Sequence, residues 1–291
     1  DSATKRIWNI PTGFRFLNRL KGGNGFFFKD EIKMNRQLTN FHASLAKKNE
    51  KTYLEWQKFI SGETSVNTDI VAPDILAAWI RCRNLGVDPE SDPQNPVLRG
   101  HDYLLNLEEN KQLIETAYPL LDKLFRLARG SVVALFDQRG YLLHVIGDKR
   151  FEESNRKFNW YPGVLWTEEH GGNNTISAIL RDKIPAFIVG CQHYKKLLHD
   201  VSASSAPIFS PEGELLRGVA LAPYLHMTHP HTVGMSIAVA QAIENELKAR
   251  KVLEQRNAAY DKTDIISNLQ KAIITYILEA MIAADNEGIL S

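Results

Sequence analysis

The sequence predicts an α+β fold in which an antiparallel sheet is flanked by helices, preceded by a helical N-terminal segment and followed by a long helix. Three observations predict it. Apolar residues recur at helical spacing over residues 41–129, strand-like runs separated by turn signals fill residues 130–230, and residues 231–281 are helical in pattern again. The 291 residues, 44% hydrophobic and 24% charged, suffice to bury a sizeable core.

Residues 1–40 form a basic N-terminal arm that is expected to hold at most short elements, because the glycine-rich "KGGNG" interrupts it. Its only acidic residues are Asp1, Asp30 and Glu31, against the basic residues Lys5, Arg6, Arg15, Arg19, Lys21, Lys29, Lys33 and Arg36. The whole chain is balanced, with 35 Lys and Arg against 34 Asp and Glu. It therefore lacks the charge excess of a nucleic-acid-binding protein.

Residues 41–129 form the helical N-terminal region. Pro73 stands near a predicted helix start and Gly86 is suited to the stop of the same helix. The proline-rich "DPESDPQNPV" is a connector, and a second long helix is expected from about residue 108 to 129.

The period changes at residue 130. "GSVVALFDQRGYLLHVIGD" predicts a hairpin that turns at residues 137–140, and "KIPAFIVGCQH" a further strand. "SSAPIFSPEGELLRGVALAPYL" predicts a second hairpin that turns at residues 211–213. Short helices are expected near residues 150–158, 173–182 and 193–198, so the sheet has helices inserted between its strands.

The helix over residues 231–281 carries apolar side chains at spacings of three and four, as in a coiled-coil seam: Ile266, Leu269, Ile273, Tyr276 and Ala280. A helix packed within one monomer would also explain the pattern. The length of the helix, its charged outer positions and its place at the end of the domain favour a helix that forms a homodimer.

Three stretches superficially suggest an enzyme or a metal site. "HDVSASS" places His199 near Ser202, Ser204 and Ser205, but no nucleophile elbow of the G-x-S-x-G kind is present, and the small residues favour close backbone approach in a strand. "HMTHPH" has no common zinc spacing, and three consecutive residues such as Glu168–His170 do not converge on one ion. We therefore expect neither catalysis, nor a metal, nor a cofactor.

Only two cysteines occur, Cys82 and Cys191, which fits a reducing compartment and buried structural roles. No run of 18 apolar residues and no signal-peptide pattern is present. The sequence thus predicts a cytoplasmic protein without membrane contact. Because it lacks an initial Met and stops just after an apolar run, we expect it to be part of a longer protein.

The stretch "WTEEHGGNNTISAIL" combines acidic residues, a histidine and two glycines ahead of a helix. The glycines could form an anion-binding nest, but the rest of a phosphate-binding loop is missing. A simpler interpretation is a cap, in which Asn173 or Asn174 satisfies the first N–H groups of the helix and Asn174, Thr175 and His170 lie at the mouth of a cavity. Trp160 and Trp166 flank a Pro-Gly turn and are suited to line that cavity.

Several motifs resemble one family, the sensor regions of sigma-54-dependent transcriptional activators of the acetoin and dihydroxyacetone type. "ILAAWIRCRNLGVDP" resembles the helix that opens those regions, with matches at Trp79, Arg81, Cys82, Arg83, Gly86, Val87 and Pro89. The quoted Trp-Thr-Glu-Glu stretch also matches, as do the segments Gly190, Gln192, His193, Tyr194 and Ala203, Ser204, Ser205, Ala206, Pro207, Ile208.

The resemblance implies a GAF-like sensor domain over residues 130–230, a dimerisation and signalling helix over residues 231–281, and the start of a PAS domain at residues 282–291. It implies a small-molecule effector, bound by Trp160, Trp166, His170, Asn174, His193, Tyr194 and Ser204. DNA and sigma-54 RNA polymerase would be contacted by domains absent from this chain. The alternative is a regulatory module controlled by a partner protein with no small-molecule ligand.

Overall fold

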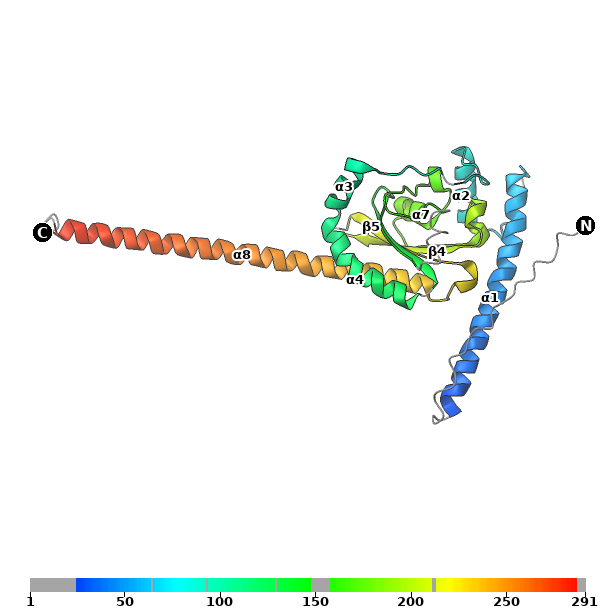
Figure 1. Ribbon diagram of the computed structural model, residues 1–291, viewed down its shortest axis with the longest axis horizontal. Helices are drawn as coiled ribbons and strands as arrows, with labels where there is room; N and C mark the ends of the chain where they lie inside the picture. The colour runs from blue at the N-terminus through cyan, green and yellow to red at the C-terminus, as the bar shows by residue number, and fades with distance from the viewer. Residues whose placement is uncertain are drawn as a thin grey trace, which may run out of the picture. The chain divides into compact units, whose positions relative to one another are not determined.

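The computed structural model describes residues 25–286 except 64, 93, 129, 148–157 and 211–212. The chain divides into two units after Leu45, and the sheet and the pocket belong to the second, Ala46–Ser291. The expected α+β fold is confirmed. It is a five-stranded antiparallel sheet flanked by helices, with a long helix at its C-terminal end (Figure 1).

Helix α1 spans Gly25–Ile60 and so takes in part of the predicted N-terminal arm. It begins at the last glycine of "KGGNG", and residues 26–60 contain neither Gly nor Pro to interrupt it. Residues 25–40 are therefore helical rather than an arm with at most short elements. The rest of that arm, residues 1–24, lies outside the described residues.

Helix α2, Pro73–Asn84, has the predicted start and stop. Pro73 is its first residue, where the missing N–H costs no hydrogen bond. Gly86 adopts a φ of +73°, and the Val87 N–H then donates to the Cys82 carbonyl, which closes the C-terminus.

The predicted helix over residues 108–129 is confirmed as α4 (Lys111–Leu127), and a further helix that was not predicted, α3 (Gly100–Glu109), precedes it. They meet at Asn110, whose φ of −109° and ψ of 7° are not helical. Its side-chain Nδ2 donates to the carbonyl of Asn106 at 2.7 Å, and its Oδ1 accepts from Arg217 Nε at 2.6 Å. These side-chain bonds stabilise the break, which apolar spacing alone does not reveal.

The sheet has the order β2-β1-β5-β4-β3, and all neighbours are antiparallel. The strands are β1 Ser131–Asp137, β2 Leu142–Ile146, β3 Ala186–Val189, β4 Ser202–Phe209 and β5 Leu215–Pro223. The hairpin turn at residues 137–140 is as predicted, and part of the second turn, residues 211–212, lies outside the described residues.

The strand period of two separates the faces of the sheet. One face carries Val133, Leu135, Ala206, Ile208 and Leu221, which pack with α4 and with the first turns of α8 (Thr232–Asn286). The other carries Ala134, Phe136 and Ala220, which pack with Ile176 and Ile179 of α7 (Thr175–Asp182). Figure 1 shows α4 and α8 running together along the sheet.

The remaining short elements lie between the strands: α6 Glu168–Gly171, η1 Gly190–Gln192, η2 Lys196–Leu198 and η3 Leu225–Met227. The predicted helix over 150–158 falls mainly outside the described residues. Residues 282–286, where the first strand of a PAS domain was predicted, continue α8, and 287–291 are not described. Among the described helices, none combines the length and apolar character needed to cross a membrane.

Candidate functional site

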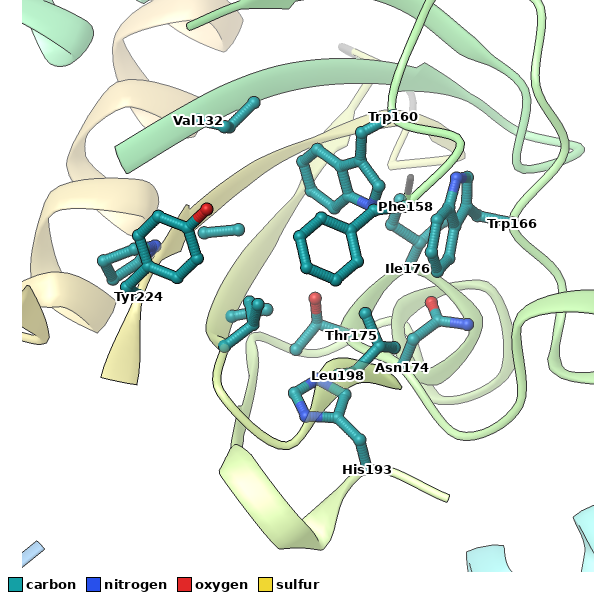
Figure 2. A pocket seen from close by; sticks show the side chains of 14 residues that line it. Val132, Phe158, Trp160, Trp166, Asn174, Thr175, Ile176, His193, Leu198 and Tyr224 are labelled. Atoms are coloured by element: carbon teal, nitrogen blue, oxygen red, sulfur yellow. The ribbon is translucent and has the colours of Figure 1, made fainter. Parts of the chain in front are cut away.

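A pocket lies between the α7 face of the sheet and the segments that cover it (Figure 2). Its empty space is about 540 Å³ including solvent at its mouth, and about 40 Å³ of it is open to the centres of water molecules. That room suits a few waters or a small organic molecule. The described lining consists of Val132, Phe158, Trp160, Trp166, Asn174, Thr175, Ile176, His193, Leu198, Val201, Ala203, Ala222, Pro223 and Tyr224.

Four of the sequence-predicted site residues line this pocket: Trp160, Trp166, Asn174 and His193. The indoles of Trp160 and Trp166 meet edge to face with ring centroids 5.7 Å apart, and Trp166 Nε1 donates to the Asn159 carbonyl at 3.2 Å. Figure 2 shows both indoles beside the ring of Phe158, so aromatic surfaces form one wall.

The other three predicted residues do not line the pocket. Ser204 lies on the opposite face of β4, where its hydroxyl bonds that of Ser236 on α8 at 2.6 Å. Tyr194 is buried in the cluster that α1 and α2 form with residues 188–194, whose segment 190–194 we call the loop. His170 lies on α6, and its Nδ1 is 2.8 Å from the hydroxyl of Thr167, the N-cap of that helix.

The sequence contained a signal for two lining residues that the prediction missed, Ala203 and Tyr224, and for Thr175, which was expected at the mouth of the cavity but was not counted among the ligand-binding residues. In β4, a strand with Ser204 on one face must place Ala203 and Ser205 on the other, and Ala203 lines the pocket. Thr175 follows the cap residue directly and so lies at the same helix end. Tyr224 carried the same signal, because it lies two residues after Ala222, just past the end of β5, where it forms a bridge with Val201. Phe158 had no such signal, because the loop that carries it follows no period.

The N-terminus of α7 is capped as predicted. Asn174 Oδ1 accepts from the Ser177 N–H at 2.9 Å, and the Ser177 hydroxyl lies 3.3 Å from the Asn174 N–H. Asn174 Nδ2 also donates to the Gly172 carbonyl at 2.8 Å, so both ends of this amide have partners within the protein. Thr175 differs, because its Oγ1 accepts from the Ser205 hydroxyl at 2.7 Å and its own hydrogen remains available. Figure 2 shows this hydroxyl directed into the pocket.

His193 supplies the second polar group. Its Nδ1 lies 2.9 Å from the Gly190 carbonyl, so Nδ1 carries the hydrogen and Nε2 is an acceptor. No described residue bonds Nε2. Burial of the ring, the largest cause, lowers the pKa of His193 to about 4, and the neighbouring His199 adds to the effect. The imidazole is therefore neutral near pH 7.

The two buried histidines predict a pH dependence of stability. Burial also lowers the pKa of His199 to about 4, with Lys196 contributing. In the unfolded chain these two histidines bind protons near pH 6.5, whereas in the folded chain they stay neutral until a lower pH. The free energy of unfolding should therefore be constant above about pH 7 and fall by about 2 kcal/mol per histidine between pH 7 and pH 5.

Urea unfolding at a series of pH values measures this dependence. His193→Gln should remove about half of the fall, because glutamine does not titrate. A fall of unchanged size in the variant would contradict the assignment to His193.

The geometry around His199 does not support a hydrolase. His199 Nε2 donates to the His193 carbonyl at 3.2 Å, and the ring packs edge-on against Trp56 at 4.6 Å. The nearby hydroxyls pair with one another, Ser202 with Thr228 and Ser204 with Ser236. Within the described residues, no group of three or more His, Cys, Asp or Glu is placed to hold a metal ion.

One motif residue of the opening helix, Arg81, binds the segment that leads into the pocket. Arg81 donates from Nε and Nη2 to the two carboxylate oxygens of Glu168, both at 2.9 Å. Arg181 of α7 approaches the same carboxylate at 3.3 Å. A bidentate pair of this kind fixes orientation as well as distance, so α2 and α7 are held to one segment.

The family model described as "MimR, N-terminal domain" matches residues 53–233, more than half of the chain. The chain belongs to this family. The predicted resemblance to sensor regions of transcriptional activators is confirmed, and relatives of this chain are transcriptional activators.

Curated proteins similar to this chain include transcriptional activators. The acetoin dehydrogenase operon transcriptional activator AcoR of Bacillus subtilis is 27% identical over 67% of this chain and 32% of its own length. The propane 2-monooxygenase operon transcriptional activator MimR of Mycolicibacterium goodii is 28% identical over 66% and 32%. The chain thus spans about a third of the length of these relatives.

A solved structure shares the fold. The Escherichia coli DhaR(N)–DhaL complex contains a chain that matches with a TM-score of 0.63 at 19% identity, over 66% of this chain and 67% of that one.

Proposed function

We propose that this chain is the sensory region of a bacterial sigma-54-dependent activator and that it binds a small, uncharged organic metabolite in the pocket. The observation that carries the proposal is the pairing of aromatic walls with two inward polar groups, the Thr175 hydroxyl and His193 Nε2. An apolar pocket with a few convergent polar groups is the usual form of a small-molecule site.

The lining restricts the chemistry of the ligand. The described residues that line the pocket include no Lys, Arg, Asp or Glu, so a charged ligand would lose its hydration without gaining an ion pair. The Thr175 hydroxyl can donate and His193 Nε2 can accept. A neutral ketone or aldehyde can accept the Thr175 hydrogen bond, and an alcohol or diol can both accept from Thr175 and donate to His193 Nε2.

Strand β4 offers a route from the pocket to α8. Ser205 bonds Thr175 on the pocket side, and the adjacent Ser204 bonds Ser236 of α8 on the other side. A ligand that moves Thr175 therefore acts on a strand bonded directly to the signalling helix. Binding biases a two-state arrangement, with a coupling free energy that is typically 1–3 kcal/mol.

In this proposal α8 pairs with α8 of a second copy to form a homodimer, because its exposed part carries Ile266, Leu269 and Ile273, each at least 50% exposed. Tyr276 and Ala280, predicted in the same seam, belong to the part of α8 whose side chains are not described. DNA and sigma-54 RNA polymerase would be contacted by further domains of a longer, cytoplasmic protein.

A thermal-shift panel tests the site. Small ketones, aldehydes and diols should stabilise the chain, and amines and carboxylates of the same size should not. A ligand at 100 times its Kd adds about 2.7 kcal/mol. Thr175→Val keeps the side-chain shape but removes the hydroxyl, and should weaken a neutral hit about tenfold.

Ser205→Ala is the matched control, because it removes the partner of Thr175 but leaves the Thr175 hydroxyl in the pocket. Its effect on Kd should be the smaller of the two. Equal stabilisation by carboxylates or amines would contradict the uncharged class.

The alternative function is control by a partner protein without a small-molecule ligand. It is supported by the DhaR(N)–DhaL complex, in which a chain of the same fold is bound to another protein. If the chain is a dimer and no compound in the thermal-shift panel changes its unfolding temperature, the result would favour this alternative.

A further inference from the structure

The pocket residue His193 is held by side chains of helices α1 and α2. Trp79 Nε1 of α2 donates to the carbonyl of Gln192 at 2.8 Å, and Trp56 Nε1 of α1 donates to the carbonyl of Tyr194 at 2.9 Å. The carbonyls of the two residues that flank His193 in the sequence are therefore each bound to an indole from the N-terminal helices.

The neighbouring backbone is held in the same way. The Cys191 N–H donates to Asn49 Oδ1 of α1 at 2.7 Å, and Asn173 Nδ2 joins Trp79 on the Gln192 carbonyl at 3.0 Å. Gly190 has a φ of +50°, and a Cβ on it would lie 2.0 Å from Asn49 Oδ1. The approach of α1 to this loop thus requires a glycine.

An apolar cluster closes the contact between the helices and the loop. It contains Trp56, Phe59, Val71, Ile75, Trp79, Cys82, Val87, Ile188 and Tyr194. We call this contact the α1–α2 seam. Both cysteines are buried beside it, Cys82 in the cluster and Cys191 next to Asn49.

We propose that the α1–α2 seam is part of the sensor: Asn49, Trp56 and Trp79 are positioning residues that aim His193 into the pocket, so that pocket occupancy and seating of α1 are coupled. The proposal rests on the proposed function only in taking His193 as a ligand contact. The coupling is reciprocal. If packing of α1 on the loop raises the affinity for a ligand by some factor, ligand binding raises the equilibrium constant for that packing by the same factor.

The coupling gives α1 a role in signalling. Helix α1 is continuous from Gly25 to Ile60, and the seam holds only its last turns. A change in how residues 49–60 pack on the loop is therefore a change in the position of the C-terminal turns of α1.

The first experiment needs no ligand. NMR of the His193 imidazole reports its environment, in which His199 is the other titratable group. Trp56→Phe keeps an aromatic ring but loses the donor, and should raise the pKa of His193 from about 4 toward its ordinary value. Phe59→Leu, in the same cluster and in ring contact with Tyr194 but without a hydrogen bond to the loop, should change it less. An equal change in the His193 pKa in both variants, or no change in either, would overturn the proposal.

Asn49 provides a milder variant, because it is only partly buried. Asn49→Ala removes the acceptor for the Cys191 N–H, and should accelerate thiol labelling of Cys191, followed by peptide mass spectrometry, by roughly fivefold or more. Asn49→Asp retains an acceptor oxygen and should restore the slow rate. The same labelling rate in all three proteins would contradict the proposed hold on the loop.

The reciprocal experiment uses butan-2-one as the probe. If it stabilises the wild-type chain, it should also slow labelling of Cys191 by roughly fivefold or more, and less so in Asn49→Ala. Stabilisation with unchanged labelling would refute the coupling. Absence of any stabilisation counts against the proposed function, and the NMR comparison then decides the seam by itself.

Discussion

Replacement of Gly190 by alanine should lower the free energy of unfolding by roughly 3 kcal/mol. Two costs add. The φ of +50° disfavours any residue with a Cβ by about 1 kcal/mol. The new Cβ would also lie 2.0 Å from Asn49 Oδ1 and 3.0 Å from the His199 carbonyl, so α1 or the loop must shift, which typically costs 1–3 kcal/mol. Urea unfolding measures the difference.

Gly62→Ala is the matched control. Gly62 has a similar positive φ, +88°, but nothing lies within 4 Å of its Cβ position, so only the conformational cost of about 1 kcal/mol remains. Adding Asn49→Ala to Gly190→Ala should restore part of the loss, because the closest clash is removed. An additive double variant would show that the close approach of α1 is not what Gly190 serves.

Much of the fold could be predicted because its signals are local. The first residue of α2, the glycine after its end, the cap at Asn174 and the turn of residues 137–140 each depend on a few neighbouring residues. The break at Asn110 could not be predicted in this way. It depends on Arg217, which is 107 residues away in the sequence.

The candidate site was predicted in part for the same reason. Trp160, Trp166 and Asn174 lie where a turn and a helix cap place them, and these are local features. Ser204 and Tyr194 belong to motifs that are just as distinctive, but their side chains serve contacts with α8 and with α1 and α2. A motif marks a residue with a constrained environment and does not distinguish a pocket from a packing contact.

If α8 forms the proposed dimer, Ile266→Asp with Ile273→Asp should separate it into monomers. Both residues are exposed in the single chain, at 50% and 53%, and are seven residues apart, so both fall at one position of the heptad. Pairing would bury four carboxylates per dimer in an apolar seam. Even a few kcal/mol of cost weakens association more than a hundredfold, because each 1.4 kcal/mol is a factor of ten. Light scattering after size-exclusion chromatography measures the change in mass.

Asn268→Asp with Thr275→Asp is the matched control, since it adds the same charge at the same spacing on the same helix. These positions lie two residues beyond Ile266 and Ile273, off the predicted seam, so the control should remain a dimer. The described lining of the pocket contains no residue of the exposed part of α8, so we expect each copy to form its pocket alone. The monomeric variant should therefore still be stabilised by a neutral ligand. A monomer that binds the ligand would show that α8 transmits the signal without forming the site, whereas loss of binding would show that the pocket is completed by the second copy.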